Sequence, residues 1–261
     1  MRKKTELYHL QWIQAKEIGS GAFARVYLVE DEKGESYACK VSTRLNILRR
    51  EAGLMKEVES EGIAGFIDYR ESDGMGYLLM EYVKGENLEE YLRKNGPLPE
   101  RLVIMVGIAV AEVLDLIHKN EVCPIVFRDV KPGNLILEKG ENVRLVDFGC
   151  ACPMGVNLEV AGSVGYAAPE QMKTGTMLSP ASDVYALGKT LQTLSGGKGS
   201  RMLRKVLERC IADEADERIP NMRWLIRLLH CCEKPYAGLT NMEKAVLRAD
   251  FRVLKNIYEK D

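Results

Sequence analysis

The sequence lacks a net charge of any size. Its 37 Lys and Arg residues nearly balance its 38 Asp and Glu residues, which leaves a formal net charge of −1 at pH 7. Proteins that attract nucleic acid or anionic membranes through their overall field carry a clear basic excess. The composition therefore argues against a nucleic-acid-binding protein, and any site for phosphate has to be local.

Long apolar runs are also missing. The longest, LVIMVGIAVA at residues 102–111, is followed by Glu112 and is too short to cross a bilayer. Residues 1–13 contain basic side chains without an apolar core behind them. We therefore expect neither a secretory signal nor a membrane segment within this chain.

Paired cysteine motifs and clustered histidines are absent as well. The seven cysteines are an odd number and include no CxxC pair, so neither a disulfide framework nor a zinc knuckle is predicted. The three histidines, at positions 9, 118 and 230, are too scattered for a metal cluster and are expected to be ordinary surface or partly buried side chains. A reducing, cytoplasmic location fits these observations best.

The first third of the chain has strand character. Residues 12–41 alternate between apolar and polar types and break at glycines, which predicts three antiparallel strands. Residues 44–60 have apolar side chains at helical spacing and predict an amphipathic helix. Residues 64–83 return to strand character, with a hairpin turn at Asp73–Gly74.

The rest of the chain is mostly helical. Helical periods run through 87–120 with a break at NGPLPE, residues 95–100, and only 134–138 and 143–146 read as short strands. We predict an α+β fold with a small β-rich N-lobe, residues 1–83, and a larger α-helical C-lobe, residues 84–261. The C-lobe includes an expected helix over 239–261.

A glycine-rich turn lies between the first two predicted strands, in GSGAFARV, residues 19–26. Because Gly19 and Gly21 have no Cβ, the main chain there could approach a polyphosphate closely and direct amide groups at it. A hairpin turn that needs positive φ at both glycines would also account for them. The turn alone does not decide between these interpretations, since Ala24 replaces the third glycine of the usual pattern.

A lysine and a glutamate follow this turn. Lys40 lies in a predicted strand, where its ammonium group could reach bound phosphates. Glu51 shares the inward face of the predicted helix with Leu48 and Met55, where an unpaired carboxylate would be costly. Pairing with Lys40 would remove that cost, with Glu57, on a more polar side of the helix, as the alternative partner.

A compact polar turn occurs in FRDVKPGNLIL, residues 127–137. Asp129 could accept a hydroxyl proton, Lys131 could neutralise a migrating phosphoryl group, and Asn134 could bind a metal ion. Further on, Asp147 ends a predicted strand and offers the hard oxygen ligand that Mg²⁺ requires. The alternative is a chance loop of polar residues.

With these motifs in this order, the sequence resembles the eukaryotic-type (Hanks-type) Ser/Thr protein kinases from about Ile18 to about Arg218. The motifs are GSGAFARV, YACK, RREA, FRDVKPGN, DFG and AAPE. The resemblance implies a bilobal protein-kinase fold and transfer of the ATP γ-phosphoryl group to Ser or Thr of a protein substrate, with Mg²⁺ or Mn²⁺. The compact length favours a bacterial source.

The resemblance also implies roles for individual residues. Met80, Glu81 and Val83 would form the hinge at the adenine, with Met80 as gatekeeper. The nucleotide-binding residues would be Gly19, Gly21, Val26, Ala38, Lys40, Met80, Glu81, Val83 and either Leu135 or Leu137. The residues that act in the transfer would be Asp129, Lys131, Lys40 and Glu51, and the metal ligands Asn134 and Asp147. Asp183 would brace the main chain of the polar turn, and Arg218 would pair with Glu170.

One residue and the length of one chain interval depart from the family pattern. Phe127 stands where most members have a structural histidine, and we expect its ring to pack with Phe148, Met55 and Phe66 without abolishing activity. The interval between Lys40 and Glu51 is short, which leaves little chain to begin a helix before its glutamate.

The stretch after DFG is the most informative departure. Many relatives order it by phosphorylation, because the new dianion pairs with the arginine before the catalytic aspartate. Here CACPMGVNLEVAG, residues 150–162, contains no Ser, Thr or Tyr. We therefore expect activity without phosphorylation, with the Glu159 carboxylate either paired with Arg128 or solvated. Ser163 matches a position that hydrogen-bonds near Asp129 and Lys131.

Two other functions stay open. A pseudokinase that binds nucleotide as a scaffold would fit Phe127, Ala24 and the short interval before Glu51. A small-molecule kinase of the aminoglycoside or choline type could share the PGN turn, although Lys131 and Ser163 favour protein substrates.

Overall fold

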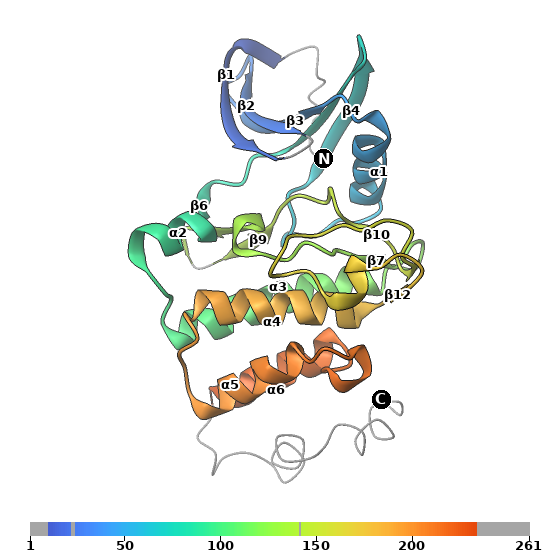
Figure 1. Cartoon of the computed structure of the whole chain (residues 1–261). Helices are drawn as coiled ribbons and strands as arrows, with labels where there is room; N and C mark the ends of the chain where they lie inside the picture. The colour runs from blue at the N-terminus through green and yellow to red at the C-terminus, as the bar shows by residue number, and fades with distance from the viewer. Residues whose placement is uncertain (1–9, 22–23, 141, 234–261) are drawn as a thin grey trace. The chain divides into compact units, whose positions relative to one another are not determined.

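The computed structural model describes residues 10–21, 24–140 and 142–233 (Figure 1). The chain divides into two compact units, Met1–Lys84 with Val146–Gly149, and Gly85–Leu145 with Cys150–Asp261. The first unit is rich in strands and the second in helices, which confirms the predicted α+β fold class. The helix predicted over 239–261 lies outside the described residues.

The first unit contains an antiparallel sheet in the order β1-β2-β3-β5-β4 (Figure 1). This sheet includes the three strands predicted over 12–41 and the predicted hairpin. Asp73 and Gly74 both have positive φ, 51° and 76°, as the tight turn of a two-residue hairpin requires. The strands are β1 Leu10–Ser20, β2 Arg25–Asp31, β3 Ser36–Ser42, β4 Phe66–Ser72 and β5 Met75–Glu81.

The alternation of β3 decides which way its lysine points. Tyr37 and Cys39 belong to a buried apolar cluster with Val29 and Leu79 on one face of the sheet. Because successive side chains of a strand point to opposite faces, Lys40 lies on the other face.

The helix of the first unit is α1, Leu45–Lys56, which confirms the helix predicted in this region. Its buried side chains include Leu48, Ala52 and Met55, which recur at the spacing of one helical face. Glu51 lies within the same buried set, so the packing of the apolar face carries this carboxylate into the interior of the unit.

The second unit is built on helices (Figure 1). Helix α3 packs against α4 and α6, and α4 packs against α5. A Cβ at Gly107 of α3 would come within 2.8 Å of Leu191 and 2.9 Å of Leu229, so glycine permits the close approach of these helices. The helices are α2 Leu88–Asn95, α3 Glu100–His118, α4 Pro180–Leu194, α5 Arg201–Cys210 and α6 Met222–Cys232. None of the helices in the described part of the chain has the length and apolar character needed to span a membrane.

The second unit also contains short strands. β8 and β9 confirm the strands predicted over 134–138 and 143–146. The expectation of a mostly helical remainder is confirmed. Five further strands occur among its described residues, and each is too short to show an alternating pattern in the sequence. The pairs and sheets are β6 Gly85–Asn87 with β8 Leu135–Glu138 and β9 Val143–Leu145, β7 Ile125–Val126 with β10 Cys152–Pro153, and β11 Gly155–Val156 with β12 Met177–Leu178.

Candidate active site

The first unit holds a cluster of three charged residues, which we call the lysine cluster: Lys40, Glu51 and Asp147. Lys40 Nζ donates to both carboxylate oxygens of Glu51, at 2.8 Å each, and to Asp147 Oδ1 at 2.6 Å. The expected contact between Lys40 and Glu51 is therefore present, and the alternative partner Glu57 is exposed at the end of α1.

The short interval before Glu51 does not prevent this contact. Strand β3 ends at Ser42 and α1 begins at Leu45, so almost no connecting chain is needed. The Arg44 main-chain N–H donates to Ser42 Oγ at 3.0 Å and closes the tight connection. Helix α1 thus starts early enough to place Glu51 in its second turn.

Burial and charge act together on the lysine cluster. Burial alone would lower the pKa of Lys40, but the carboxylates of Asp147 and Glu51 outweigh it and raise that pKa. Burial, helped by the nearby Asp147 carboxylate, raises the pKa of Glu51 to about 7 against the opposing effect of Lys40. Glu51 is only 1% exposed, so its charged form depends on Lys40 for compensation.

Asp147 sits in a tight turn of the DFG motif. Its φ is 71°, in the left-handed region, and its Oδ1 accepts the Gly149 N–H at 2.9 Å. A Cβ at Gly149 would come within 2.9 Å of Asp147 Oδ1 and 3.1 Å of Lys40 Nζ. Glycine is thus required here because any side chain would press into the lysine cluster.

The glycine turn of the first unit is described on both sides of residues 22–23. Gly19 pairs with Val26 across β1 and β2, and the Gly21 N–H donates to the Ala24 carbonyl at 2.9 Å. Neither Gly19 nor Gly21 has a positive φ. The alternative in which a positive-φ hairpin demands both glycines is therefore wrong, and close approach of a ligand stays the interpretation for them.

The residues expected at the adenine occupy neighbouring strands of the first unit. Ala38 of β3 pairs with Met80 of β5, and both side chains are buried. Glu81 ends β5, and its main-chain N–H donates to the Gly65 carbonyl at 2.8 Å. Val83 follows in the connection toward the second unit and is also buried.

The second unit presents the other polar group, which we call the aspartate turn: residues 127–134. Asp129 Oδ2 accepts from Lys131 Nζ at 2.9 Å and from Asn134 Nδ2 at 3.0 Å. Asn134 Nδ2 also donates to the Asp129 carbonyl at 2.8 Å, which fixes the turn on itself. Lys131 Nζ reaches Ser163 Oγ at 2.6 Å, and this contact confirms the predicted position of Ser163.

One oxygen of the aspartate turn is left without a protein partner. Asp129 is 6% exposed, and its Oδ1 is buried with no hydrogen-bond partner among the described residues. A buried carboxylate oxygen without a donor is costly unless a ligand supplies one. Oδ1 thus differs from Oδ2, which is held by Lys131 and Asn134.

Helix α4 supports the aspartate turn through hydrogen bonds. Asp183 accepts the Phe127 N–H with Oδ2 and the Arg128 N–H with Oδ1, each at 2.8 Å, which confirms its predicted role. The same Oδ2 contacts His118 Nε2 at 2.7 Å. His118 was expected to be an ordinary histidine, but it is buried on α3 and forms part of this support.

The backbone of the turn shows why it needs support. Arg128 has a φ of 69°, which is rare for a residue with a side chain. Thr190 Oγ1, on the same helix α4, donates to the Val130 carbonyl at 2.9 Å and gives the turn a second point of attachment. Phe127 is fully buried within the described structure, while its expected packing with Phe148, Met55 and Phe66 stays a prediction.

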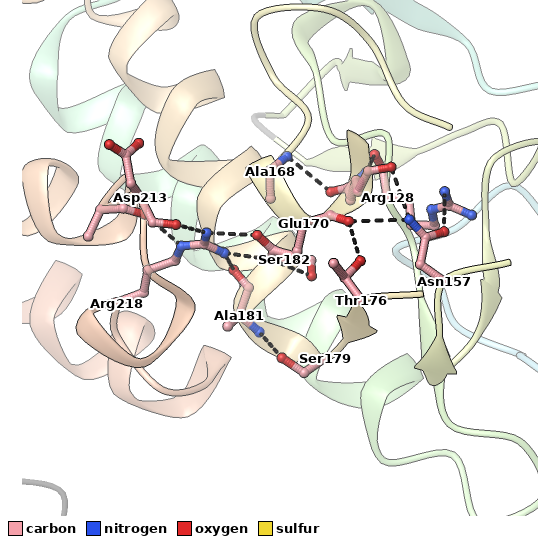
Figure 2. A network of polar contacts seen from close by, with 12 residues as sticks. Arg128, Asn157, Ala168, Glu170, Thr176, Ser179, Ala181, Ser182, Asp213 and Arg218 are labelled. Carbon is pink, nitrogen blue, oxygen red and sulfur yellow. Dashed lines mark hydrogen bonds and ion pairs between the residues drawn. The ribbon is translucent and has the colours of Figure 1, made fainter. Parts of the chain in front are cut away.

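An ion pair joins the AAPE motif to the segment between α5 and α6 of the second unit (Figure 2). Arg218 Nη1 and Nη2 donate to the two carboxylate oxygens of Glu170 at 2.7 and 2.8 Å, as predicted. Burial alone would raise the pKa of Glu170, but the hydrogen bonds from Arg218 hold this pKa below its ordinary value.

The remaining predicted residues lie on β8. Leu135 is fully buried, whereas Leu137 is partly exposed on the same face of the strand. Ile136 is also partly exposed and lies on the opposite face of β8. Asp147 belongs to the first unit and Asn134 to the second, so their pairing as metal ligands stays a prediction.

Arg128 contacts the stretch after DFG through main-chain oxygens. Its Nη2 donates to the main-chain carbonyl of Glu159 at 2.6 Å, and Glu159 itself is exposed, so the choice between a paired and a solvated Glu159 carboxylate stays a prediction. The chain at 157–161 folds around the guanidinium and presents backbone oxygens to it. Asn157 and Gln171, which sequence reasoning missed, are buried in this region, and their burial leaves no periodic signal in the sequence.

Comparison with known proteins agrees with these features. The family model described as "Protein kinase domain" matches residues 12–223. The serine/threonine-protein kinase PknA of Corynebacterium glutamicum is 34% identical over 210 residues, covering 73% of this chain and 43% of that protein. The kinase drp72 of Corynebacterium efficiens is 34% identical over 200 residues, covering 69% of this chain and 37% of its own length. PrkC of Bacillus subtilis is 33% identical over 195 residues, covering 69% of this chain and 30% of its own.

Proposed function

The chain belongs to the protein kinase family, and on this premise we propose that it is an active enzyme that transfers the γ-phosphoryl group of ATP to Ser or Thr hydroxyls of proteins. The sequence spans less than half the length of the relatives named above, so their substrates and partners are not carried over to it. The support for the proposal comes from the contacts and burial of this chain's own residues.

The observation that carries the proposal is Asp129 Oδ1, which is buried beside Lys131 and has no hydrogen-bond partner in the part of the chain that the structure describes. A general base has to present an oxygen to the proton that it accepts, and the other oxygen of this carboxylate is already held by Lys131 and Asn134. We propose that the acceptor hydroxyl oxygen attacks the γ-phosphorus, its proton passes to Asp129 Oδ1, and the bond from the γ-phosphorus to the bridging oxygen breaks to release ADP.

Other residues bind and orient the reactants in this proposal. Lys40, fixed by Glu51, would hold the α- and β-phosphates, and Lys131 would neutralise the transferred group. Gly19, Gly21 and Val26 would cover the nucleotide. Ala38, Met80, Glu81, Val83 and either Leu135 or Leu137 would contact the adenine.

The donor set suits a magnesium or manganese ion. Asp147 offers a carboxylate with a side chain 44% exposed, and Asn134 offers an amide oxygen. Hard oxygen donors of this kind are what Mg²⁺ prefers. When bound, the ion would neutralise charge on the phosphates, and Asn134 and Asp147 would hold it.

We also propose that transfer does not require phosphorylation of residues 150–162. This stretch has no Ser, Thr or Tyr, and Arg128 already has oxygen partners in it. Lys131, bonded to Ser163, supports Ser or Thr as acceptor because a short side chain leaves room for that lysine. The cytoplasmic location stays a prediction.

A labelled-ATP assay tests the proposed function. The purified chain is incubated with Mg²⁺, γ-labelled ATP and a generic acceptor protein, in parallel with Asp129→Asn and Asp147→Asn. We expect transfer by the parent chain and a loss of at least about a hundredfold in each variant. Asn95→Ala, at an exposed asparagine on α2, is the matched control and should behave like the parent.

The other outcomes of this assay identify the alternatives. Nucleotide binding without any transfer, to protein or to small alcohols and amino sugars, would make the chain a pseudokinase. Transfer to small alcohols or aminoglycosides alone would make it a small-molecule kinase. Transfer that persists in Asp129→Asn would overturn the role of Asp129.

A further inference from the structure

Arg128 is a buried cation whose charge is met by neutral oxygens. It is 1% exposed, and its Nη2 donates to Asn157 Oδ1 at 3.3 Å (Figure 2). The same Nη2 donates to the carbonyls of Glu159 and Ala161 at 2.6 and 3.5 Å. A buried guanidinium has to be compensated by hydrogen bonds or by an opposite charge. Here oxygens from residues 157–161 accept from Nη2, where a phosphoryl group would do so in many relatives, whereas Nε has no hydrogen-bond partner among the described residues.

Asn157 has one possible orientation in this setting. Its Nδ2 donates to the Glu170 carbonyl at 3.2 Å (Figure 2). It also donates to the carbonyls of Gln171 and Lys173 at 3.1 and 2.8 Å. A flipped amide would turn its N–H groups toward the guanidinium and its oxygen toward three carbonyl oxygens. Both halves of the amide are therefore used, one for Arg128 and one for the AAPE region.

The main chain of Asn157 is fixed as well. Its N–H donates to the Thr176 carbonyl at 2.7 Å, and its carbonyl accepts the Gly175 N–H at 2.8 Å. Asn157 is 1% exposed, so these bonds are shielded from water. The residue joins the segment after DFG to the segment after AAPE at one buried point.

A second amide holds the main chain of Arg128. Gln171 Nε2 donates to the Arg128 carbonyl at 2.8 Å and to the Ala161 carbonyl at 3.2 Å, while its Oε1 accepts the Ala168 N–H at 3.2 Å. Gln171 is fully buried. The side chain of Arg128 is thus held by Asn157 and its carbonyl by Gln171, immediately before Asp129 in the chain.

We propose that Asn157 is a positioning residue that takes the place of a phosphorylated side chain. Its amide fixes the Arg128 guanidinium to residues 157–161 and to the AAPE region, and through Arg128 it sets the orientation of the Asp129 carboxylate. The inference rests on the proposed function, since it concerns the same transfer reaction. A purely structural amide would stabilise the fold equally whether or not Arg128 is present.

Kinetic coupling between Asn157 and Arg128 tests the proposal. Asn157→Ala removes both halves of the amide, Asn157→Asp keeps an acceptor toward Arg128 but no donor for the three carbonyls, and Arg128→Met removes the charge. All proteins are treated with phosphatase before assay. We expect Asn157→Ala and Asn157→Asp each to lower kcat by about tenfold or more, with KM for ATP changed less than about twofold.

The double variant separates a positioning role from a structural one. In an Arg128→Met background, Asn157→Ala should change kcat by less than about twofold, because the residue through which it acts is gone. Equal, independent losses in both backgrounds would overturn the proposal, as would a kcat for Asn157→Ala within about twofold of the parent. Asn95→Ala is again the control.

Amide hydrogen exchange gives a test that needs no variant to be active. In the unphosphorylated parent chain, the amides of Asn157 and Gly175 should exchange slowly, because both are hydrogen-bonded at the buried point. Rapid exchange of both amides in a chain shown by mass spectrometry to carry no phosphate would overturn the proposal. If the parent shows no transfer dependent on Asp129, the proposed function fails, while this measurement still decides whether Asn157 orders the segment.

Discussion

Several charged side chains in this protein are buried and depend on a charged or polar partner. Glu51 is compensated by Lys40, and Asp129 is held through one oxygen only. Burial makes each charge costly by itself, so the partner determines whether the charged form persists. These residues are where the local chemistry departs most from that of an exposed side chain.

Glu51→Gln should change the pH dependence of stability. The ordinary pKa of this carboxyl is 4.5, and in the folded chain it is raised to about 7. Between these values the folded state binds more protons than the unfolded state, so the stability contributed by Glu51 is full below pH 4.5 and is lost as the pH rises through about 7. We expect the free energy of unfolding of Glu51→Gln to improve relative to the parent by about 1 to 3 kcal/mol between pH 5 and pH 8.

Urea unfolding of both proteins at several pH values measures this difference. Glu59→Gln, at an exposed position beyond α1, is the control and should show no trend. A constant difference between Glu51→Gln and the parent from pH 5 to pH 8 would show that the buried carboxyl does not titrate in this range.

At the level of elements, short strands and helix ends hold the segment between DFG and AAPE. β10 pairs with β7 near its start, and β11 pairs with β12 beyond AAPE. Asp183 and Thr190 of α4 hold the aspartate turn against the same helix. Because each of these strands has only two residues, side-chain contacts contribute much of what fixes the segment.

Arg218→Ala should strongly destabilise the second unit. The side chain of Arg218 is fully buried, pairs with Glu170 and donates to the carbonyls of Ala181, Ala212 and Asp213. Removing it leaves the partly buried Glu170 carboxylate without its main partner and empties the buried site of the guanidinium, and breaking such a pair typically costs about 3–5 kcal/mol.

Thermal or urea unfolding measures the loss. Arg204→Ala removes an exposed arginine of α5 and serves as the matched control, with an expected change within about 0.5 kcal/mol. A loss below about 1 kcal/mol for Arg218→Ala would show that the pair is replaced by solvent or by a new contact.

At the scale of the whole molecule, the charges are nearly balanced and the sequence covers 30 to 43% of the relatives named here. No global field directs partners to this protein, so recognition of a substrate has to be local. Residues 150–162 contain no Ser, Thr or Tyr that could be phosphorylated. The regulation expected of the whole chain therefore depends on whether activity requires a phosphate in this stretch.

Phosphatase treatment should leave the activity of the parent chain unchanged within about twofold. The buried contacts of Arg128 with Asn157 and with main-chain carbonyls are present without a phosphoryl group. Activity is measured before and after treatment, with removal of phosphate verified by mass spectrometry. A collapse of activity traced to a phosphate within residues 150–166 would contradict this expectation.

The sequence by itself determined the division into a strand-rich and a helical part, because alternation and helical spacing are local patterns. It also determined the Lys40–Glu51, Glu170–Arg218 and Asp183 contacts, since ordered motifs identified both partners. The tertiary structure alone decided the roles of His118, Asn157 and Gln171, which are single polar residues without a period or a motif. Their functions depend on partners brought close by folding, as when Asn157 meets Arg128 across 29 positions of chain, and burial then turns an ordinary amide into a specific contact.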